Sequence, residues 1–211
     1  MILTEDRWRR ALDVGFAGTI LIVTLPLSAA AAVLVRLGSP GPVLHRSVRA
    51  GRHGQPFVLY KLRTMVDDAA VIGPAITAGR DPRVTPVGRV LRDTKVDELP
   101  QLVNVLRGEM SLVGPRPEDP RYVAMYNDEQ RQVLAALPGI TSPASVIYRH
   151  EHELLGQAQD SQDYYVSVLM PRKIEVDLAY LRRRTIRSDL RVLLQTAVAL
   201  TRRPGSACSA P

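Results

Sequence analysis

A stretch near the N-terminus, Val14 to Val35, places 22 residues in a row without a charge. A helix embedded in a membrane needs about 20 such residues. The run is too long for the apolar part of a signal peptide, and Arg36 and Leu37 follow it where a small-residue cleavage site would stand. The sequence therefore predicts a membrane-embedded helix at the start of the chain.

Basic residues flank this stretch on both sides. The flanking residues are Arg7, Arg9 and Arg10 before it, and Arg36, Arg46, Arg49 and Arg52 after it. Because basic flanks tend to stay in the cytoplasm, both ends of the helix are expected on that side. Pro26 lies at the centre, where it bends the helix, and Thr24 and Ser28 are expected to bond the freed carbonyls. These features favour a re-entrant helix that enters one leaflet and returns, with a kinked spanning helix as the alternative.

The length of 211 residues suits one folded domain beyond this helix. We expect a membrane segment over residues 1–37, a single domain over 38–203 and a disordered tail over 204–211. One cysteine, Cys208, cannot build a disulfide framework or a thiolate metal site. The oligomeric state is left open, a homo-oligomer included.

The chain is basic, with 28 Lys and Arg against 21 Asp and Glu and a net charge of +7. Such a charge predicts anionic partners, which include acidic membrane lipids, phosphorylated substrates and nucleic acid. Aromatic residues are few and are not interleaved with the basic ones, so the sequence predicts no platform for stacking bases. We therefore expect no nucleic-acid partner.

The soluble part is expected to be an α+β domain that is mostly helical, with one short β-hairpin. Residues 43–46 and 57–62 have strand patterns on either side of a glycine-rich turn. Thr85 and Pro86 suit the N-cap and first position of a short helix. Amphipathic helices are expected over residues 122–137, 173–181 and 188–200. Basic residues between the last two suit an anionic membrane surface.

Two adjacent carboxylates, Asp97 and Glu98, precede a short helix with apolar residues at helical spacing. If Asp97 lies near the N-cap, Pro100 falls in the first turn, where its missing N–H does no harm. The acid pair would then lie at a helix mouth, beside free backbone N–H groups. Two interpretations stay open here. One is a structural cap followed by a first-turn acid, and the other is a functional pair.

Basic side chains near this pair suit phosphate. Strand alternation places Lys61 and Arg63 on one strand face, either as a phosphate contact or as a solvated edge. Arg116 stands between two prolines that fix the backbone, which suits a bidentate phosphate clamp or a rigid surface turn. His150 and His152 lack partner ligands at usual spacing, so a solvated pair is favoured over a metal site.

Four motifs in order, FVLYKLRTM, DELPQL, LRGEMSLVGPRP and LPGIT, closely resemble the bacterial sugar transferase family, and the match runs from about Arg9 to Leu200. These monotopic phosphoglycosyl transferases move a sugar phosphate from a nucleotide sugar to a polyprenyl phosphate. The resemblance implies a re-entrant helix in the bacterial inner membrane, with the catalytic domain on the cytoplasmic face. It also implies a UDP-sugar and undecaprenyl phosphate as substrates, and release of UMP in the first membrane step of glycoconjugate or exopolysaccharide synthesis. One departure is Leu25-Pro26, where the family commonly has Ser-Pro.

The resemblance also implies roles for single residues. Asp97 maps onto the nucleophile that forms a covalent aspartyl phosphosugar, with Mg²⁺ held by Asp97, and Glu98 maps onto its partner as base or positioning group. Lys95 departs from the family, which commonly has Ser there. Four basic residues are implied as contacts to substrate phosphate, namely Lys61, Arg92, Arg116 and Arg149.

Two other functions remain as alternatives. A membrane-anchored basic scaffold that binds anionic lipid or nucleic acid accounts for the charge and the apolar stretch. It gives no reason for the acid pair or for the rigid Pro-Arg-Pro turn. An ordinary glycosyltransferase that releases UDP is the other alternative.

Overall fold

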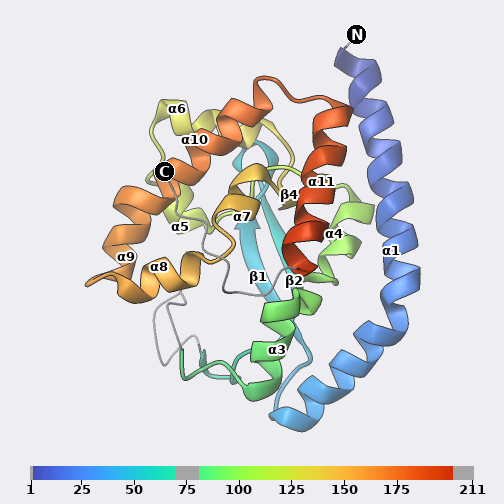
Figure 1. The fold of residues 1–211 in the computed structure, drawn as a ribbon, viewed down its shortest axis with the longest axis vertical. Coiled ribbons are helices and arrows are strands. Elements are labelled where there is room, and N and C mark those ends of the chain that lie inside the picture. Colours follow the sequence, from blue (N-terminus) through green and yellow to red (C-terminus); the bar gives the residue numbers. More distant parts are fainter. Residues whose placement is uncertain (1, 70–80, 202–211) are drawn as a thin grey trace.

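The structure is a computed structural model that describes residues 2–69 and 81–201. The tail predicted over 204–211 lies outside this range. The described chain is mostly helical, as predicted (Figure 1). Its helices are α1 (Ile2–Gly38), α3 (Pro86–Thr94), α4 (Gln101–Arg107), α5 (Pro120–Val123), α6 (Asp128–Arg131), α7 (Pro143–Ile147), α8 (Glu151–Gln157), α9 (Ser161–Tyr164), α10 (Met170–Leu181) and α11 (Ile186–Thr201). Its strands are β1 (Leu44–Ala50), β2 (Pro56–Leu62), β3 (Ser111–Val113) and β4 (Gly139–Thr141). Short helical turns are η1 (Arg52–Gly54), η2 (Val96–Glu98), η3 (Gln132–Ala135) and η4 (Tyr165–Leu169).

Helix α1 runs along one edge of the molecule, and its axis curves in the second half (Figure 1). From Asp6 to Gly38 it is long and apolar enough to cross a membrane, by length and composition. One face of this helix is buried against the rest of the chain. Ala17 packs in a cluster with residues of α4 and β3, and Ala31 and Val35 pack in another with residues of β2 and α3. Helix α1 thus lies along the rest of the chain, here called the body, in both its halves.

The predicted bonding around Pro26 is wrong. A hydroxyl in a helix reaches the carbonyl four residues earlier, so Thr24 donates to Ile20 O at 2.7 Å. The carbonyl that Pro26 frees belongs to Ile22. The hydroxyl of Ser28 is buried without a hydrogen-bond partner in the described chain.

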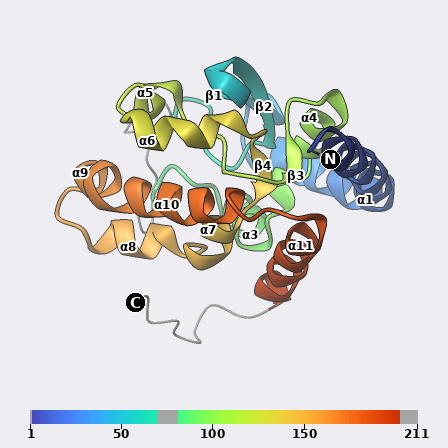
Figure 2. The same cartoon turned by 90° about the horizontal axis from the view of Figure 1, so that it is seen from above.

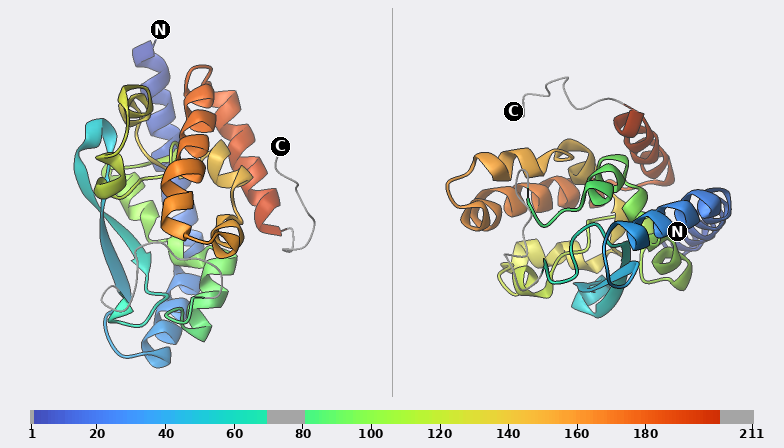
Figure 3. Two further views of the ribbon diagram at one scale, coloured as in Figure 1. Left: turned by 90° about the vertical axis from the view of Figure 1, so that its left-hand side faces the viewer. Right: turned by 90° about the horizontal axis from the view of Figure 1, so that it is seen from below.

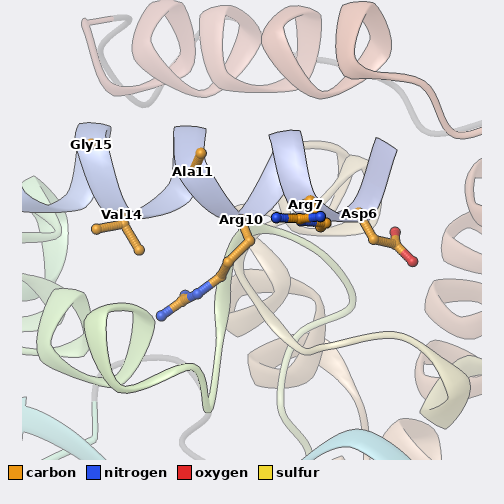
Figure 4. A pocket seen from close by; sticks show the side chains of 6 residues that line it. All are labelled: Asp6, Arg7, Arg10, Ala11, Val14 and Gly15. Carbon is orange, nitrogen blue, oxygen red and sulfur yellow. The ribbon is translucent and has the colours of Figure 1, made fainter. Parts of the chain in front are cut away.

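Arg10 anchors α1 to the end of α4. Its guanidinium donates to the carbonyl oxygens of Val105 at 2.5 Å and Leu106 at 2.9 Å. These carbonyls lie in the last turn of α4, where carbonyls lack their regular helical partners, and that of Val105 also accepts from Gly108 N at 3.0 Å. Figure 4 shows Arg10 reaching from α1 toward α4, beside a hollow that Val14 and Gly15 also line.

Asp189 joins α1 to the start of α11. This buried carboxylate accepts from Arg9 Nε at 2.8 Å, from Arg184 Nε at 2.9 Å and from the Tyr180 hydroxyl. Arg184 also donates to the carbonyl of Val113, at the end of β3, at 2.7 Å. One carboxylate therefore connects α1, α11 and β3.

The β-hairpin is confirmed, and its first strand is longer than predicted. Strands β1 and β2 pair antiparallel from Leu44 opposite Leu62 to Ala50 opposite Pro56. They form a long ribbon at the side of the molecule away from α10 and α11 (Figure 3). The short parallel pair of β3 and β4 was not predicted.

Helix α10 lies between the α5–α6 segment and the α7–α8 segment (Figure 2). Its Ile174 and Leu178 belong to a core cluster with residues of α5, η3 and α8. The helices expected over 173–181 and 188–200 are confirmed in α10 and α11.

The single helix expected over 122–137 is wrong, because the segment divides into α5, α6 and η3. Asn127 begins a new helix there. Its side chain accepts from Gln130 N at 2.8 Å, and the Gln130 side chain accepts from Asn127 N at 3.0 Å. This capping box stabilises the start of a second helix, within a stretch whose apolar spacing alone predicts one continuous helix.

Substitution Asp189→Asn is expected to destabilise the protein by about 3 kcal/mol, since it leaves Arg9 and Arg184 without their shared countercharge. Thermal unfolding of the detergent-solubilised protein measures the effect. Glu129→Gln is the control, because its ion pair with Arg182 is exposed and worth at most about 1 kcal/mol. Equal losses in the two variants would contradict the role given to Asp189.

Candidate active site

The acid pair lies in the tight connection between α3 and α4. Lys95 ends α3 in a left-handed conformation with φ of 58°, and η2 follows at once. Asp97 and Glu98 are both buried in this turn, with 5% and 8% of their surface exposed. Pro100, and not Asp97, stands at the N-cap position of α4. The interpretation of Asp97 as a structural N-cap is therefore wrong.

A close approach of backbones fixes α3 beside the end of β2. The Thr85 hydroxyl caps α3 as predicted, accepting from Gly88 N at 2.9 Å. A Cβ atom on Gly88 would lie 2.0 Å from Thr64 O, so any side chain there would push α3 away. With α3 held this close, Arg92 Nε donates to the Thr64 hydroxyl at 2.8 Å.

The Glu98 carboxylate forms ion pairs with two cationic side chains. Its Oε1 lies 3.1 Å from Lys61 Nζ and 3.0 Å from Arg116 Nη2. Burial would raise the pKa of Glu98, but the charges of Arg116 and Lys61 outweigh it and hold the pKa well below its usual value. Burial in turn lowers the pKa of Lys61 despite the neighbouring carboxylate. Glu98 is thus a fixed anion.

The surroundings of the Asp97 carboxylate differ from those of the Glu98 carboxylate. Its carboxylate makes no hydrogen bond and no ion pair within 4 Å in the described chain, and of its two oxygens only Oδ1 is enclosed without a partner. Burial raises its pKa; the charge of Lys61 opposes this, and that of Glu98 adds to it. Adjacent carboxylates in such unlike surroundings suit different chemical roles. Asp97 is the one available to a ligand.

The turn that carries Arg116 is rigid because two backbones meet behind it. A Cβ on Gly114 would lie 2.4 Å from Leu137 O, so only glycine fits. Pro115 and Pro117 are buried on either side of the arginine. The prediction of a stiff turn that aims Arg116 is confirmed, and its target in this structure is Glu98.

Arg149 is not brought to the acid pair by any contact in the described chain. Its Nε donates to the ring of His150 at 2.9 Å. Glu153 lies 3.7 Å from His150 and 3.9 Å from His152. No group of three His, Cys, Asp or Glu that could hold a metal occurs among the described residues. A metal at Asp97 would therefore need ligands from a substrate as well.

Two polar contacts near Arg116 were missed from the sequence. Glu151 pairs with Lys173 at 2.6 Å, and Glu118 accepts from the Tyr165 hydroxyl. Each pair joins residues more than 20 positions apart, so no periodic pattern could reveal it. The hollow of Figure 4 includes none of the predicted site residues.

Comparison with known proteins gives one family over nearly the whole chain. The model of the family described as bacterial sugar transferase matches residues 4–203. A UDP-glucose:undecaprenyl-phosphate glucose-1-phosphate transferase of Caulobacter vibrioides is 38% identical, over 92% of this chain and 70% of that protein. An Aeromonas hydrophila UDP-N-acetylgalactosamine-undecaprenyl-phosphate N-acetylgalactosaminephosphotransferase is 35% identical, over 89% of this chain and 42% of its own. A Salmonella typhimurium undecaprenyl-phosphate galactose phosphotransferase is 33% identical, over 94% of this chain and 41% of its own. This chain spans only about two-fifths of the last two relatives. The match of 4–203 and these identities show that the chain belongs to the bacterial sugar transferase family.

Proposed function

We propose that this protein transfers a sugar-1-phosphate from a UDP-sugar to undecaprenyl phosphate and releases UMP. The observation that carries the proposal is the buried, unpartnered carboxylate of Asp97 beside a Glu98 already neutralised by two cations. The names of the three relatives support the reaction class. They specify glucose, N-acetylgalactosamine and galactose, so the proposal covers the class of donor and not one sugar.

In the first step, the outer oxygen of Asp97 bonds to the sugar-bearing phosphorus. The bond from that phosphorus to the oxygen of UMP breaks, and UMP leaves with the electron pair. The product is an acyl phosphate between Asp97 and the sugar. Lys61, Arg92 and Arg116 stabilise the charge on the phosphoryl oxygens as it spreads. Arg149 is proposed as a further contact to substrate phosphate.

In the second step, an oxygen of undecaprenyl phosphate bonds to the same phosphorus, and the bond to Asp97 breaks. The Asp97 carboxylate is regenerated, and the product is an undecaprenyl diphosphate sugar. A phosphate monoester is largely ionised at neutral pH, so its attack needs no strong base. Glu98, whose pKa is held low by Arg116 and Lys61 against the effect of burial, is a poor proton acceptor and acts by positioning these cations.

Asp97 and the phosphates of the UDP-sugar together provide the kinds of ligand that Mg²⁺ binds. The ion is usually bound by one or two carboxylates together with substrate phosphates and water. Asp97 offers a carboxylate oxygen that no cation in the described chain occupies, whereas Glu98 is already paired. When bound, Mg²⁺ would neutralise charge on the diphosphate.

The packing of α1 favours embedding in one leaflet. Both halves of α1 contact the body, through Ala17 in one half and Ala31 and Val35 in the other. A helix that crossed the bilayer upright would carry these body contacts into the hydrocarbon. We infer that α1 re-enters, with both ends and the active site on the cytoplasmic face. Its opposite face exposes large apolar residues for lipid, among them Ile22, Val23 and Leu25.

Nucleotide release tests the reaction. Detergent-solubilised protein with Mg²⁺, undecaprenyl phosphate and a panel of UDP-sugars should release UMP with one donor. Asp97→Asn should lower the rate at least ~10³-fold, because it removes the nucleophile. Asp93→Asn is the matched control, since Asp93 is exposed on α3 and should leave the rate unchanged.

The same assay separates the alternatives. With labelled donor and no acceptor, the wild-type protein should release at most one UMP per chain and retain the label, and Asp97→Asn should retain none. Release of UDP would mean plain glycosyl transfer. No release from any donor by folded protein would favour the non-catalytic scaffold.

Cysteine labelling tests the topology of α1. In a Cys208→Ser background, Trp8→Cys and Leu37→Cys place thiols at exposed positions near the two ends of the helix. A membrane-impermeant maleimide should label both from the cytoplasmic side only, and Ile22→Cys from neither side. Labelling of the two ends from opposite sides would mean a spanning helix.

A further inference from the structure

The first residue of α4, Gln101, has a buried side-chain amide nitrogen that forms no hydrogen bond in the described chain. Only 2% of its surface is exposed, and its Nε2 has no hydrogen-bond partner in the described chain. A buried amide in this state costs about 1–3 kcal/mol. Such groups are rare in folded proteins, and each calls for a ligand or a function.

A second buried amide on the same helix shows the contrast. Asn104 has no exposed surface, and its side-chain amide is hydrogen-bonded to neighbouring residues. Its Oδ1 accepts from Tyr60 N at 3.2 Å, and its Nδ2 donates to Val58 O and Glu109 Oε2, both at 2.7 Å. Asn104 thus fixes α4 to β2. Gln101, three residues earlier, makes no such bond.

The unpartnered donor of Gln101 lies about one helical turn from an unpartnered acceptor. Asp97 stands four residues before Gln101, and its Oδ1 is enclosed without a partner. Asp97 lies in η2, a 3₁₀ turn in which about three residues complete one turn, so Gln101 lies just over one turn further along the same backbone. After Glu98, the last residue of η2, Leu99 and Pro100 have helical backbone angles and lead into α4. A buried donor and a buried acceptor without partners thus lie on adjacent turns of one short connection.

We propose that Gln101 is a positioning residue for Asp97. In the enzyme with donor bound, its amide donates to Oδ1 of Asp97 and so fixes the carboxylate plane, which leaves the outer oxygen to face the phosphorus. The inference rests on the proposed function, and it explains why a buried position beside the acid pair holds a polar side chain. A carboxylate free to rotate would present the wrong oxygen or the wrong lone pair for part of the time, and such misplacement lowers the rate of the chemical step.

Two variants of Gln101 and one of Asn104 test the role. Gln101→Leu removes the unsatisfied amide, so its thermal midpoint should equal or exceed that of the wild type, while kcat falls ~10–100-fold and KM for the UDP-sugar changes less than about twofold. Gln101→Glu keeps the shape but loses the donor, and should be at least as slow. Asn104→Leu should instead lower the midpoint by several degrees, because it breaks the bonds to β2.

The outcomes separate this role from a structural one and from failure of the proposed function. A lower midpoint for Gln101→Leu would mean that Gln101 serves stability, and unchanged kcat in either Gln101 variant would also overturn the inference. If the wild-type protein itself releases no UMP, the proposed function fails, and the positioning role falls with it.

Discussion

The carboxylate of Glu98 is where three separate parts of the body meet. Lys61 comes from the end of β2, Arg116 from a turn locked by glycine and proline, and Glu98 itself from the short connection of α3 to α4. Because a buried charge left alone is costly, each of these parts is held in place by the other two. The arrangement also leaves the neighbouring Asp97 unpaired. Pairing of both cations with Glu98 thus keeps the Asp97 carboxylate free of a partner in the described chain.

Helix α1 is part of this construction and not a separate anchor. It contacts α4 through Arg10 and β3 through Asp13, which accepts from Leu112 N at 3.0 Å. Helix α4 follows the acid pair, and β3 leads into the turn of Arg116. The packing of α1 on the body and the geometry around the acid pair are therefore set by the same contacts.

Much of the fold follows from local sequence. The apolar stretch, the hairpin and the Thr85 cap are each determined by neighbouring residues, and each was predicted. The prolines beside Arg116 predicted its stiff turn, but the close approach of Gly114 to Leu137 that packs it could not be read from the sequence. The parallel pair of β3 and β4 and the partners of Asp189 depend on residues far apart in the chain, where periodicity carries no information. Asn127 shows how one capping residue divides an apparently continuous helix. For the site, the motifs indicated Lys61 and Arg116, but not that both would bind Glu98.

The contacts of α1 also bear on how the chain is made. The bond of Arg9 to Asp189 joins residues 180 positions apart, and those of Arg10 and Asp13 span 95 and 99. Because translation adds about 5–20 residues per second, the ribosome completes α1 long before these partners exist. If α1 re-enters the membrane as proposed, it meets the bilayer before its partners exist, with its polar side chains undocked. The body would then fold on a helix already embedded, with the membrane as a template for the assembly of the domain that carries the acid pair.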